Sequence, residues 1–100
     1  MQRVDDMESI RELIMRTEIY TDSEEKWQLS YYLTTFKGEK DYYGLAIERA
    51  TPEGKITETE ETPAFSEDIE EATTMAKAFA RGTVLPYTLL ELTDEWLSIV

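Results

Sequence analysis

Residues 27–49 (WQLSYYLTTFKGEKDYYGLAIER) constrain the fold most, because apolar and polar side chains alternate on both sides of a short polar interruption. Successive side chains of a strand point to opposite faces, so each arm has one apolar face. We expect Gly38, within residues 37–41, to supply the positive φ that a tight turn needs. The pattern predicts a β-hairpin whose core-facing residues are Trp27, Leu29, Tyr31, Leu33, Tyr43, Leu45 and Ile47.

The second face of this hairpin carries Tyr32, Phe36 and Tyr42, and is more apolar than a fully solvated face requires. One interpretation is that the N-terminal segment or a loop covers these rings, or that they lie singly at the surface. The other is that they form a patch for a protein partner or for self-association. Tyr32, Phe36 and Tyr42 are therefore the candidate interaction surface.

A further strand is expected on each side of the hairpin. Residues 11–21 have a period of two that places Leu13, Met15, Thr17 and Ile19 on one face. Residues 51–54 (TPEG) predict a turn in which Gly54 accepts a left-handed conformation. Residues 55–62 (KITETEET) then suit a charged edge strand. The sequence predicts a four-stranded antiparallel meander over residues 11–21, 27–36, 42–50 and 55–62.

Two C-terminal helices are expected to pack on one face of this sheet. For the first, over residues 66–81, Ser66 is placed to cap the start and Gly82 to end it. Its apolar stripe consists of Ile69, Ala72, Thr73, Ala76, Phe79 and Ala80. Residues 83–87 predict an extended crossing, and Thr88 opens the second helix, over residues 88–98, with Glu91 completing a capping box. The expected fold is α+β, and 100 residues suffice for a single domain over 1–100.

Residues 1–10 carry few signals of order. Val4, Met7, Ile10 and Ile14 lie at nearly helical spacing, which favours a short helix over residues 5–14. A frayed tail is the alternative.

The residue types restrict the chemistry available to the chain. There is no histidine and no cysteine, which removes the commonest general base, transition-metal ligand and thiol nucleophile. The four glycines are isolated from one another, so neither a phosphate-binding loop nor a nucleophile elbow is present. Glu58 and Glu60 lack a calcium-loop pattern. We expect no catalytic residue, no cofactor and no metal site, and hence no enzyme.

The formal net charge of -12 disfavours binding to nucleic acid or anionic lipid, since no basic stripe offsets it. No apolar run approaches the roughly 20 residues that span a bilayer. The N-terminus is acidic and polar, unlike a secretory signal or transit peptide. These features predict a cytoplasmic location.

Two stretches resemble a small bacterial family of unknown function whose members have about this length. Residues 43–48 (YGLAIE) resemble the YGI-x-IE strand of that family. Residues 84–89 (VLPYTL) resemble its V-T-P-V-T-L turn into a final helix, with Leu85 in place of threonine and Tyr87 in place of valine. Residues 94–97 (DEWL) would be the acidic and aromatic end of that helix. The resemblance implies no catalytic residue, cofactor or substrate, because the family has no assigned activity.

The function that these observations favour is a non-enzymatic protein-interaction or regulatory module. Its partner would be another protein or a second copy of the chain, as a homodimer through the outer sheet face. The alternative is an acidic decoy that occupies the nucleic-acid site of a basic protein. That alternative requires one dense negative face made of Glu58, Glu60, Glu61, Glu67, Asp68, Glu70 and Glu71.

Overall fold

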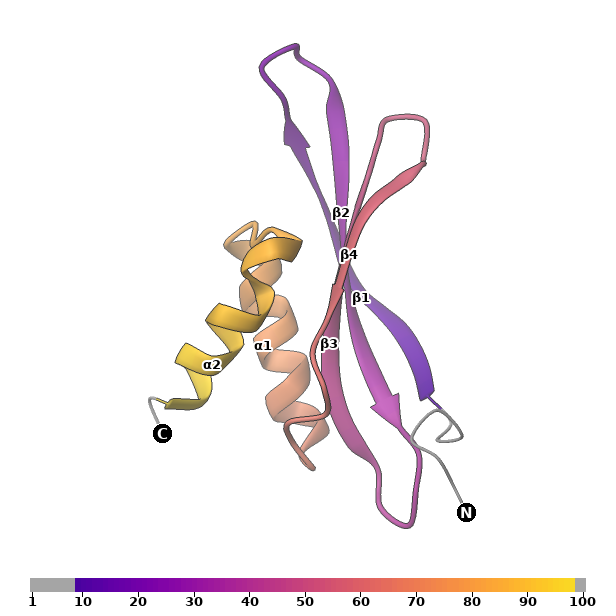
Figure 1. The fold of residues 1–100 in the computed structure, drawn as a ribbon, viewed down its shortest axis with the longest axis vertical. Helices are drawn as coiled ribbons and strands as arrows, with labels where there is room; N and C mark the ends of the chain where they lie inside the picture. The colour runs from indigo at the N-terminus through magenta and orange to yellow at the C-terminus, as the bar shows by residue number, and fades with distance from the viewer. Residues whose placement is uncertain (1–8, 99–100) are drawn as a thin grey trace.

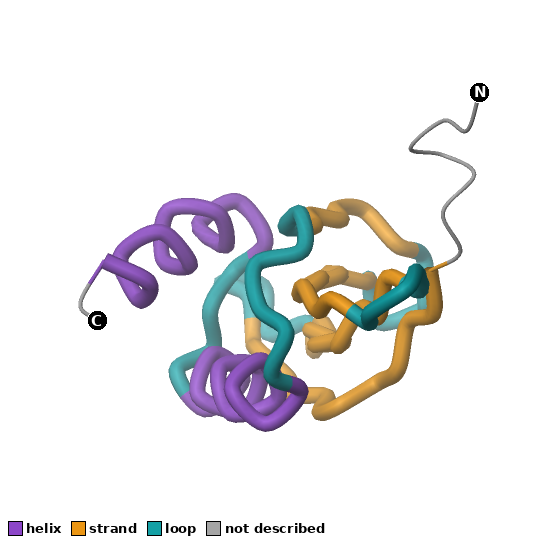
Figure 2. Tube along the Cα trace, turned by 90° about the horizontal axis from the view of Figure 1, so that it is seen from below, coloured by secondary structure: helices purple, strands orange, loops and turns teal. Residues whose placement is uncertain are grey.

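The computed structural model describes residues 9–98, in which four antiparallel strands form one sheet in the order β1-β2-β3-β4. Two helices lie on one side of this sheet (Figures 1 and 2). The predicted α+β meander with two C-terminal helices is confirmed. The elements are β1 (Ser9–Tyr20), β2 (Lys26–Phe36), β3 (Tyr42–Ala50), β4 (Ile56–Glu61), α1 (Ile69–Arg81), the 3₁₀ helix η2 (Pro86–Thr88) and α2 (Leu89–Ser98).

The core lies between the sheet and the helices, and its sheet side is the predicted apolar face of the β2–β3 hairpin. Alternation placed these side chains correctly, because β2 and β3 pair in register from Phe36–Tyr42 to Gln28–Ala50. Small residues on α1 let the helix approach the sheet closely. The buried residues of this core are Leu29, Tyr31, Leu33, Leu45, Ile47, Ala72, Met75, Ala76, Phe79, Ala80 and Leu89.

The structure of β1 differs in two ways from what the sequence predicted for the N-terminal part of the chain. It is a strand from Ser9 onward, so the short helix over residues 5–14 is wrong from Ser9 to Ile14, and its first part lies outside the described residues. A β-bulge at Ile14 shifts the register between Leu13 and Met15. Leu13 therefore pairs with Tyr32 on the outer face, whereas Met15 pairs with Tyr31 on the inner face. A uniform period of two cannot predict this change of face.

Helix α1 begins three residues later than predicted. Its N-cap is Asp68, whose Oδ1 accepts a hydrogen bond of 2.9 Å from the backbone N–H of Glu70. Ser66 instead accepts a hydrogen bond from the Asp68 backbone N–H, which forms a turn before the helix. Because the helix starts at Ile69, that side chain lies at its end and is 48% exposed rather than anchored in the core. Gly82 is the C-cap, as predicted.

The connection between the helices also differs from the predicted extended crossing. Residues 86–88 form the 3₁₀ helix η2, and the Thr88 hydroxyl donates to the Leu85 carbonyl at 2.9 Å instead of capping α2. Tyr31 contributes to this connection, since its hydroxyl donates to the Val84 carbonyl at 2.8 Å. On α2, Trp96 lies edge-on to Phe79 with 5.9 Å between the ring centroids. The two helices are thus joined through aromatic packing.

The glycines of the sheet have different structural roles. Gly54 has the predicted left-handed conformation, with φ of 91°. Gly38 does not have a positive φ, so that expectation is wrong. Gly44 is required by a close approach: a Cβ atom there would lie 2.9 Å from the Pro63 carbonyl oxygen and 2.9 Å from Thr62 Oγ1. The chain leaving β4 runs alongside β3, with hydrogen bonds to Leu45 and Tyr43, and passes too close to Gly44 for a side chain to fit.

Candidate functional site

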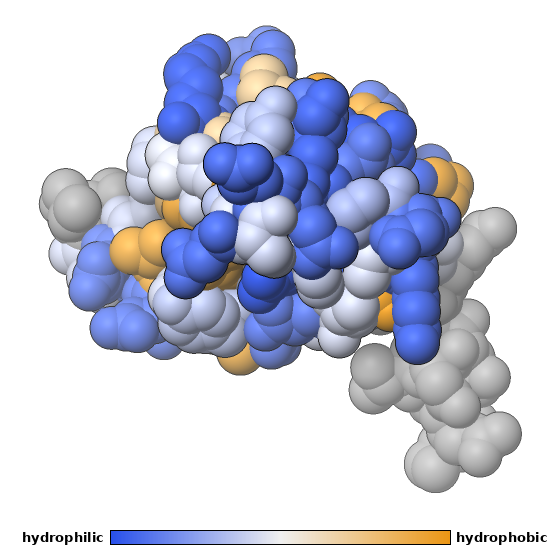
Figure 3. Space-filling view, turned by 90° about the horizontal axis from the view of Figure 1, so that it is seen from above, coloured by the Kyte–Doolittle hydropathy of each residue, from blue (hydrophilic) through white to orange (hydrophobic). Residues whose placement is uncertain are grey.

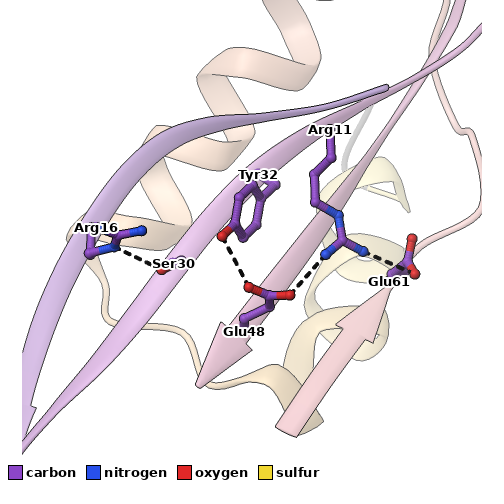
Figure 4. Close-up of polar contacts among 6 residues, drawn as sticks. All are labelled: Arg11, Arg16, Ser30, Tyr32, Glu48 and Glu61. Atoms are coloured by element: carbon purple, nitrogen blue, oxygen red, sulfur yellow. Dashed lines mark hydrogen bonds and ion pairs between the residues drawn. The ribbon is translucent and has the colours of Figure 1, made fainter. Parts of the chain in front are cut away.

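The outer face of the sheet, opposite the helices, carries the three aromatic residues singled out in the sequence. Ion pairs and hydrogen bonds connect its strands there (Figure 4). Arg11 on β1 lies 3.0 Å from Glu48 Oε2 on β3 and 3.1 Å from Glu61 Oε1 on β4. Its guanidinium is also 5.2 Å from the centroid of the Tyr32 ring. We call Arg11, Tyr32, Glu48 and Glu61 the outer-face cluster.

Tyr32 is held within this cluster. Its hydroxyl donates to Glu48 Oε1 at 3.0 Å, and the ring packs beneath the Arg11 guanidinium. Nearby, Arg16 Nε donates to Ser30 Oγ at 3.0 Å. A cation–π contact and a hydrogen bond to a carboxylate satisfy both the ring and the hydroxyl of Tyr32. The cluster therefore connects all four strands and gives Tyr32 partners within the chain.

Phe36 and Tyr42 occupy a different environment, at the end of the β2–β3 hairpin. They are directly opposite each other in the register, and Tyr42 is 41% exposed. Phe36 is four residues from Tyr32 along β2, or about 13 Å. The structure thus brings Phe36 and Tyr42 together and separates them from Tyr32.

A depression of about 270 Å³ lies at this hairpin end. Its lining consists of the two aromatic side chains and the turn, and we call it the hairpin-end depression: Phe36, Gly38, Glu39, Lys40 and Tyr42. Lys40 lies 3.6 Å from Glu67, and Lys37 lies 3.7 Å from Asp41, so charged pairs surround the rings. The depression is thus lined by two aromatic rings and by the charged residues Glu39 and Lys40.

The opposite end of the molecule presents a different surface. Seen from the side that carries the β1–β2 and β3–β4 turns, the surface is mostly hydrophilic, with scattered apolar residues (Figure 3). Near that end, the Arg49 guanidinium lies 4.7 Å from the centroid of the Trp27 ring. Trp27 is therefore half-buried beneath Arg49 and lies outside the core cluster to which the sequence assigned it.

The seven carboxylates proposed as one negative face are distributed over several surfaces. Glu60 and Glu61 are consecutive on β4 and point to opposite faces of the sheet. Glu61 belongs to the outer-face cluster, and Glu67 pairs with Lys40. Glu70 and Glu71 lie in the first turn of α1, where the helix dipole stabilises negative charge.

Tyr31 is a buried titratable residue. Burial raises the pKa of Tyr31 to about 12, and this tyrosine donates to a backbone carbonyl within the core. Within residues 9–98, acidic side chains do not gather in groups of three or more that could hold a metal ion. Over the same residues, none of the helices is both long enough and apolar enough to cross a membrane.

Sequence reasoning did not identify Arg11 as the partner of Tyr32. These residues are far apart in the chain, and a pattern confined to one strand carries no signal for a contact across several strands. The opposite charges of Arg11 and Glu48 were visible, but only the register places them on the same face.

Comparisons with known proteins give one match. Residues 10–99 match the model of a Family of unknown function (DUF6514). No curated protein and no solved structure matches the chain. This agrees with the family of unknown function that the strand and turn motifs indicated. Because the match covers nearly every residue of the four strands and two helices, the chain belongs to the Family of unknown function (DUF6514).

Proposed function

We propose that this protein is a non-enzymatic, cytoplasmic interaction or regulatory module that binds a protein partner through the hairpin-end depression. The observation that supports this most is the directly opposed pair of Phe36 and Tyr42, which flank the depression while Tyr42 is 41% exposed. Exposed aromatic side chains with a charged rim are typical of the centre of a protein interface.

The size of the depression favours a side chain of a partner over a small-molecule ligand. Pockets for drug-sized ligands usually enclose about 300–1,000 Å³, and this depression has about 270 Å³. One or two apolar side chains would fit against the two rings. The charged residues of the turn would then contact polar groups at the edge of the interface. Lys37 and Lys40 form exposed ion pairs with Asp41 and Glu67, which acidic residues of the partner would replace at little cost.

Tyr32 does not take part in the proposed partner binding, unlike Phe36 and Tyr42. Its hydroxyl and ring already have partners in Glu48 and Arg11. Taking Tyr32 into an interface would require breaking those contacts. We therefore assign partner binding to Phe36 and Tyr42, and assign Tyr32 to the stability of the sheet.

Site-specific photo-crosslinking tests the proposal. A benzoylphenylalanine in place of Tyr42 should crosslink a partner in cells, and the same group in place of Tyr87 is the matched control. Tyr87 is a 69% exposed tyrosine in η2, away from the hairpin end. Equal labelling from both positions, or none from position 42, would contradict the proposal.

Titration calorimetry with the purified partner makes the test quantitative. Tyr42→Ala and Phe36→Ala should each weaken binding by about tenfold or more, as expected for the centre of an interface. Tyr87→Ala should leave the affinity unchanged.

The salt dependence of the same binding distinguishes the acidic-decoy alternative. A decoy complex would lose affinity steeply between low and high ionic strength, because it depends on many exposed charges. Binding through Phe36 and Tyr42 should change little over the same range. Strong salt dependence together with full affinity of Tyr42→Ala would favour the decoy.

A further inference from the structure

Strand β1 is a free edge of the sheet with unusual properties. Among the described residues, it pairs only with β2. It is 12 residues long and contains no proline, lysine or glycine. Ile10 is 49% exposed and Leu13 is 43% exposed. Soluble proteins usually protect edge strands with lysine, proline or short length, because an edge presents unpaired backbone groups to other chains. The protective features that β1 does have are the bulge at Ile14 and the charge of Glu12, which lies on the inner face because it pairs with Leu33.

The other edge, β4, is built differently. It has six residues, three of which are glutamates, and it carries no positive charge. An antiparallel pair of β4 strands would bring glutamates of two copies close together, and like charges on paired strands are destabilising. The like charges of β4 thus oppose its pairing with a second β4, whereas β1 carries charges of both signs that can be opposed to each other.

We propose that β1 pairs antiparallel with β1 of a second copy, about a two-fold axis, to give a continuous eight-stranded sheet. This inference does not depend on the proposed function of the hairpin-end depression. It identifies the surface for self-association as the strand edge rather than the outer sheet face.

Because of the bulge, only some registers between the two β1 strands place the outer faces of both copies on the same side of the joined sheet. Arg11 before the bulge and Glu18 after it both lie on the outer face, since they pair with Thr34 and Gln28. A two-fold axis between Ile14 and Met15 places outer-face residues opposite outer-face residues across the two copies. Arg11 of one copy is then opposite Glu18 of the other.

The same register also pairs apolar residues on the inner face. Ile10 and Ile19 both lie there, because they pair with Thr35 and Trp27 of β2. The two-fold axis places Ile10 of one copy opposite Ile19 of the other. Apolar pairs and opposite-charge pairs that face each other across two strands both stabilise a sheet.

A neighbouring register is less favourable. Sliding one strand by two residues, so that the axis moves toward the N-terminus, still matches the faces. It opposes Arg11 to Arg16, however, and separates the isoleucine pair. Both the opposite-charge pair and the isoleucine pair therefore favour the register centred between Ile14 and Met15.

This dimer would be bivalent for the proposed partner. The hairpin end lies beside the start of β1, because Ser9 pairs with Phe36. Antiparallel pairing of β1 sends the two hairpin ends to opposite ends of the dimer. Each copy would keep its depression open, and two linked sites would bind a repeated partner more tightly than one site does.

The mass of the chain of residues 1–100 in solution tests the proposal. An edge of this length forms a small interface, so sedimentation equilibrium should span protein concentrations from about 10 µM to about 1 mM. The parent mass should rise with concentration from 11.6 kDa to twice that value. The double variant Ile10→Lys/Leu13→Lys should remain at 11.6 kDa throughout, because lysine on an edge blocks strand pairing.

A matched variant controls for the added charge. Ile56→Lys/Ile69→Lys changes two isoleucines of similar exposure, 53% and 48%, away from β1. This control, and Tyr42→Ala at the hairpin end, should dimerise as the parent does. A dimer lost in Tyr42→Ala but kept in the β1 variant would overturn the proposal in favour of self-association through the hairpin end.

Three other results would also overturn the proposal. They are a parent that stays at the mass of one chain throughout, a β1 variant that dimerises as tightly as the parent, and a mass that grows beyond two copies. The last would indicate head-to-tail pairing of β1 with β4. Hydrogen exchange of the parent is a second measurement that requires no variant: β1 amides should become more protected at high concentration, whereas β4 amides should not. Unchanged protection of β1 would contradict the proposal.

Discussion

The guanidinium of Arg11 on β1 lies 3.0 Å from Glu48 Oε2 on β3, with β2 between the two strands. This ion pair is partly shielded from water, since the Glu48 side chain is 16% exposed. Glu48 accepts hydrogen bonds from both Arg11 and the Tyr32 hydroxyl, so the ion pair also positions the carboxylate that Tyr32 contacts. The pair is thus a structural connection across the sheet.

Replacing Arg11 with methionine should lower the free energy of unfolding by about 1–3 kcal/mol, because Glu48 keeps its charge but loses its cationic partner. Urea denaturation measures this change, at a protein concentration where the mass is that of one chain. Lys26→Met is the control, because Lys26 and Glu18 form a pair that is about half exposed on both sides. An exposed pair contributes little, so the control should unfold as the parent does. Equal losses in both variants would show that the outer-face cluster has no special role.

Phe79→Ala should destabilise the protein by about 3–5 kcal/mol, because it leaves a cavity between α1 and α2 and removes the edge-on contact with Trp96. For a domain of this size, such a loss is a large part of the total stability. Thermal unfolding followed by circular dichroism measures it. A melting temperature within a few degrees of the parent would be incompatible with the helix-on-sheet core.

Gly44→Ala should lower the free energy of unfolding by about 1–3 kcal/mol, since the new methyl group would meet backbone and side-chain oxygens at 2.9 Å. Gly38→Ala is the matched control, because its nearest contact would be the Lys40 carbonyl oxygen at 3.4 Å and its φ is not positive. Chemical denaturation of both variants tests the difference. If the two substitutions cost the same, the approach of residues 62–63 to Gly44 is not as close as described.

Stability should fall at alkaline pH through Tyr31. Burial raises the pKa of Tyr31 to about 12, above its ordinary value of 10.0, so the folded state binds this proton more tightly than the unfolded state does. The contribution is therefore complete below pH 10 and is lost as the pH rises from about 10 to about 12. The loss amounts to roughly 2–3 kcal/mol.

The variant Tyr31→Phe isolates this effect from the titration of other tyrosines and of lysines. At neutral pH it should cost about 1–2 kcal/mol, because the Val84 carbonyl loses its donor. Between pH 9 and pH 12 the advantage of the parent over Tyr31→Phe should shrink and then reverse. A difference between the two proteins that does not change with pH would rule out this role for Tyr31.

Much of the fold could be predicted because its signals are local. Alternation along residues 27–36 and 42–50 identified the buried face of the β2–β3 hairpin, and Tyr31, Leu33 and Leu45 are buried there. The predicted stripe of α1 placed Ala72, Ala76 and Phe79 in the core, although Met75 was missed and Ile69 was assigned wrongly. Helix ends were less predictable, since Ser66 and Asp68 are both good capping residues and only the path of the chain selects between them.

The candidate site shows what a pattern within one strand cannot determine. Tyr32 and Tyr42 are the same residue type on the same predicted face, yet Tyr32 contacts Arg11 and Glu48, whereas Tyr42 lies exposed beside Phe36. Which tyrosine acquires internal partners depends on where β1 lies in the sheet. That position is a non-local property of the fold.

The sequence by itself determined the order of the strands and helices, the buried face of the hairpin and the left-handed turn at Gly54, because each of these follows from residues close together in the chain. Only the tertiary structure decided that the bulge at Ile14 turns Leu13 outward, that Arg11 joins three other strands, and that Phe36 and Tyr42 separate from Tyr32. These features arise when strands pair and register brings distant side chains onto one face, and no local period encodes that step.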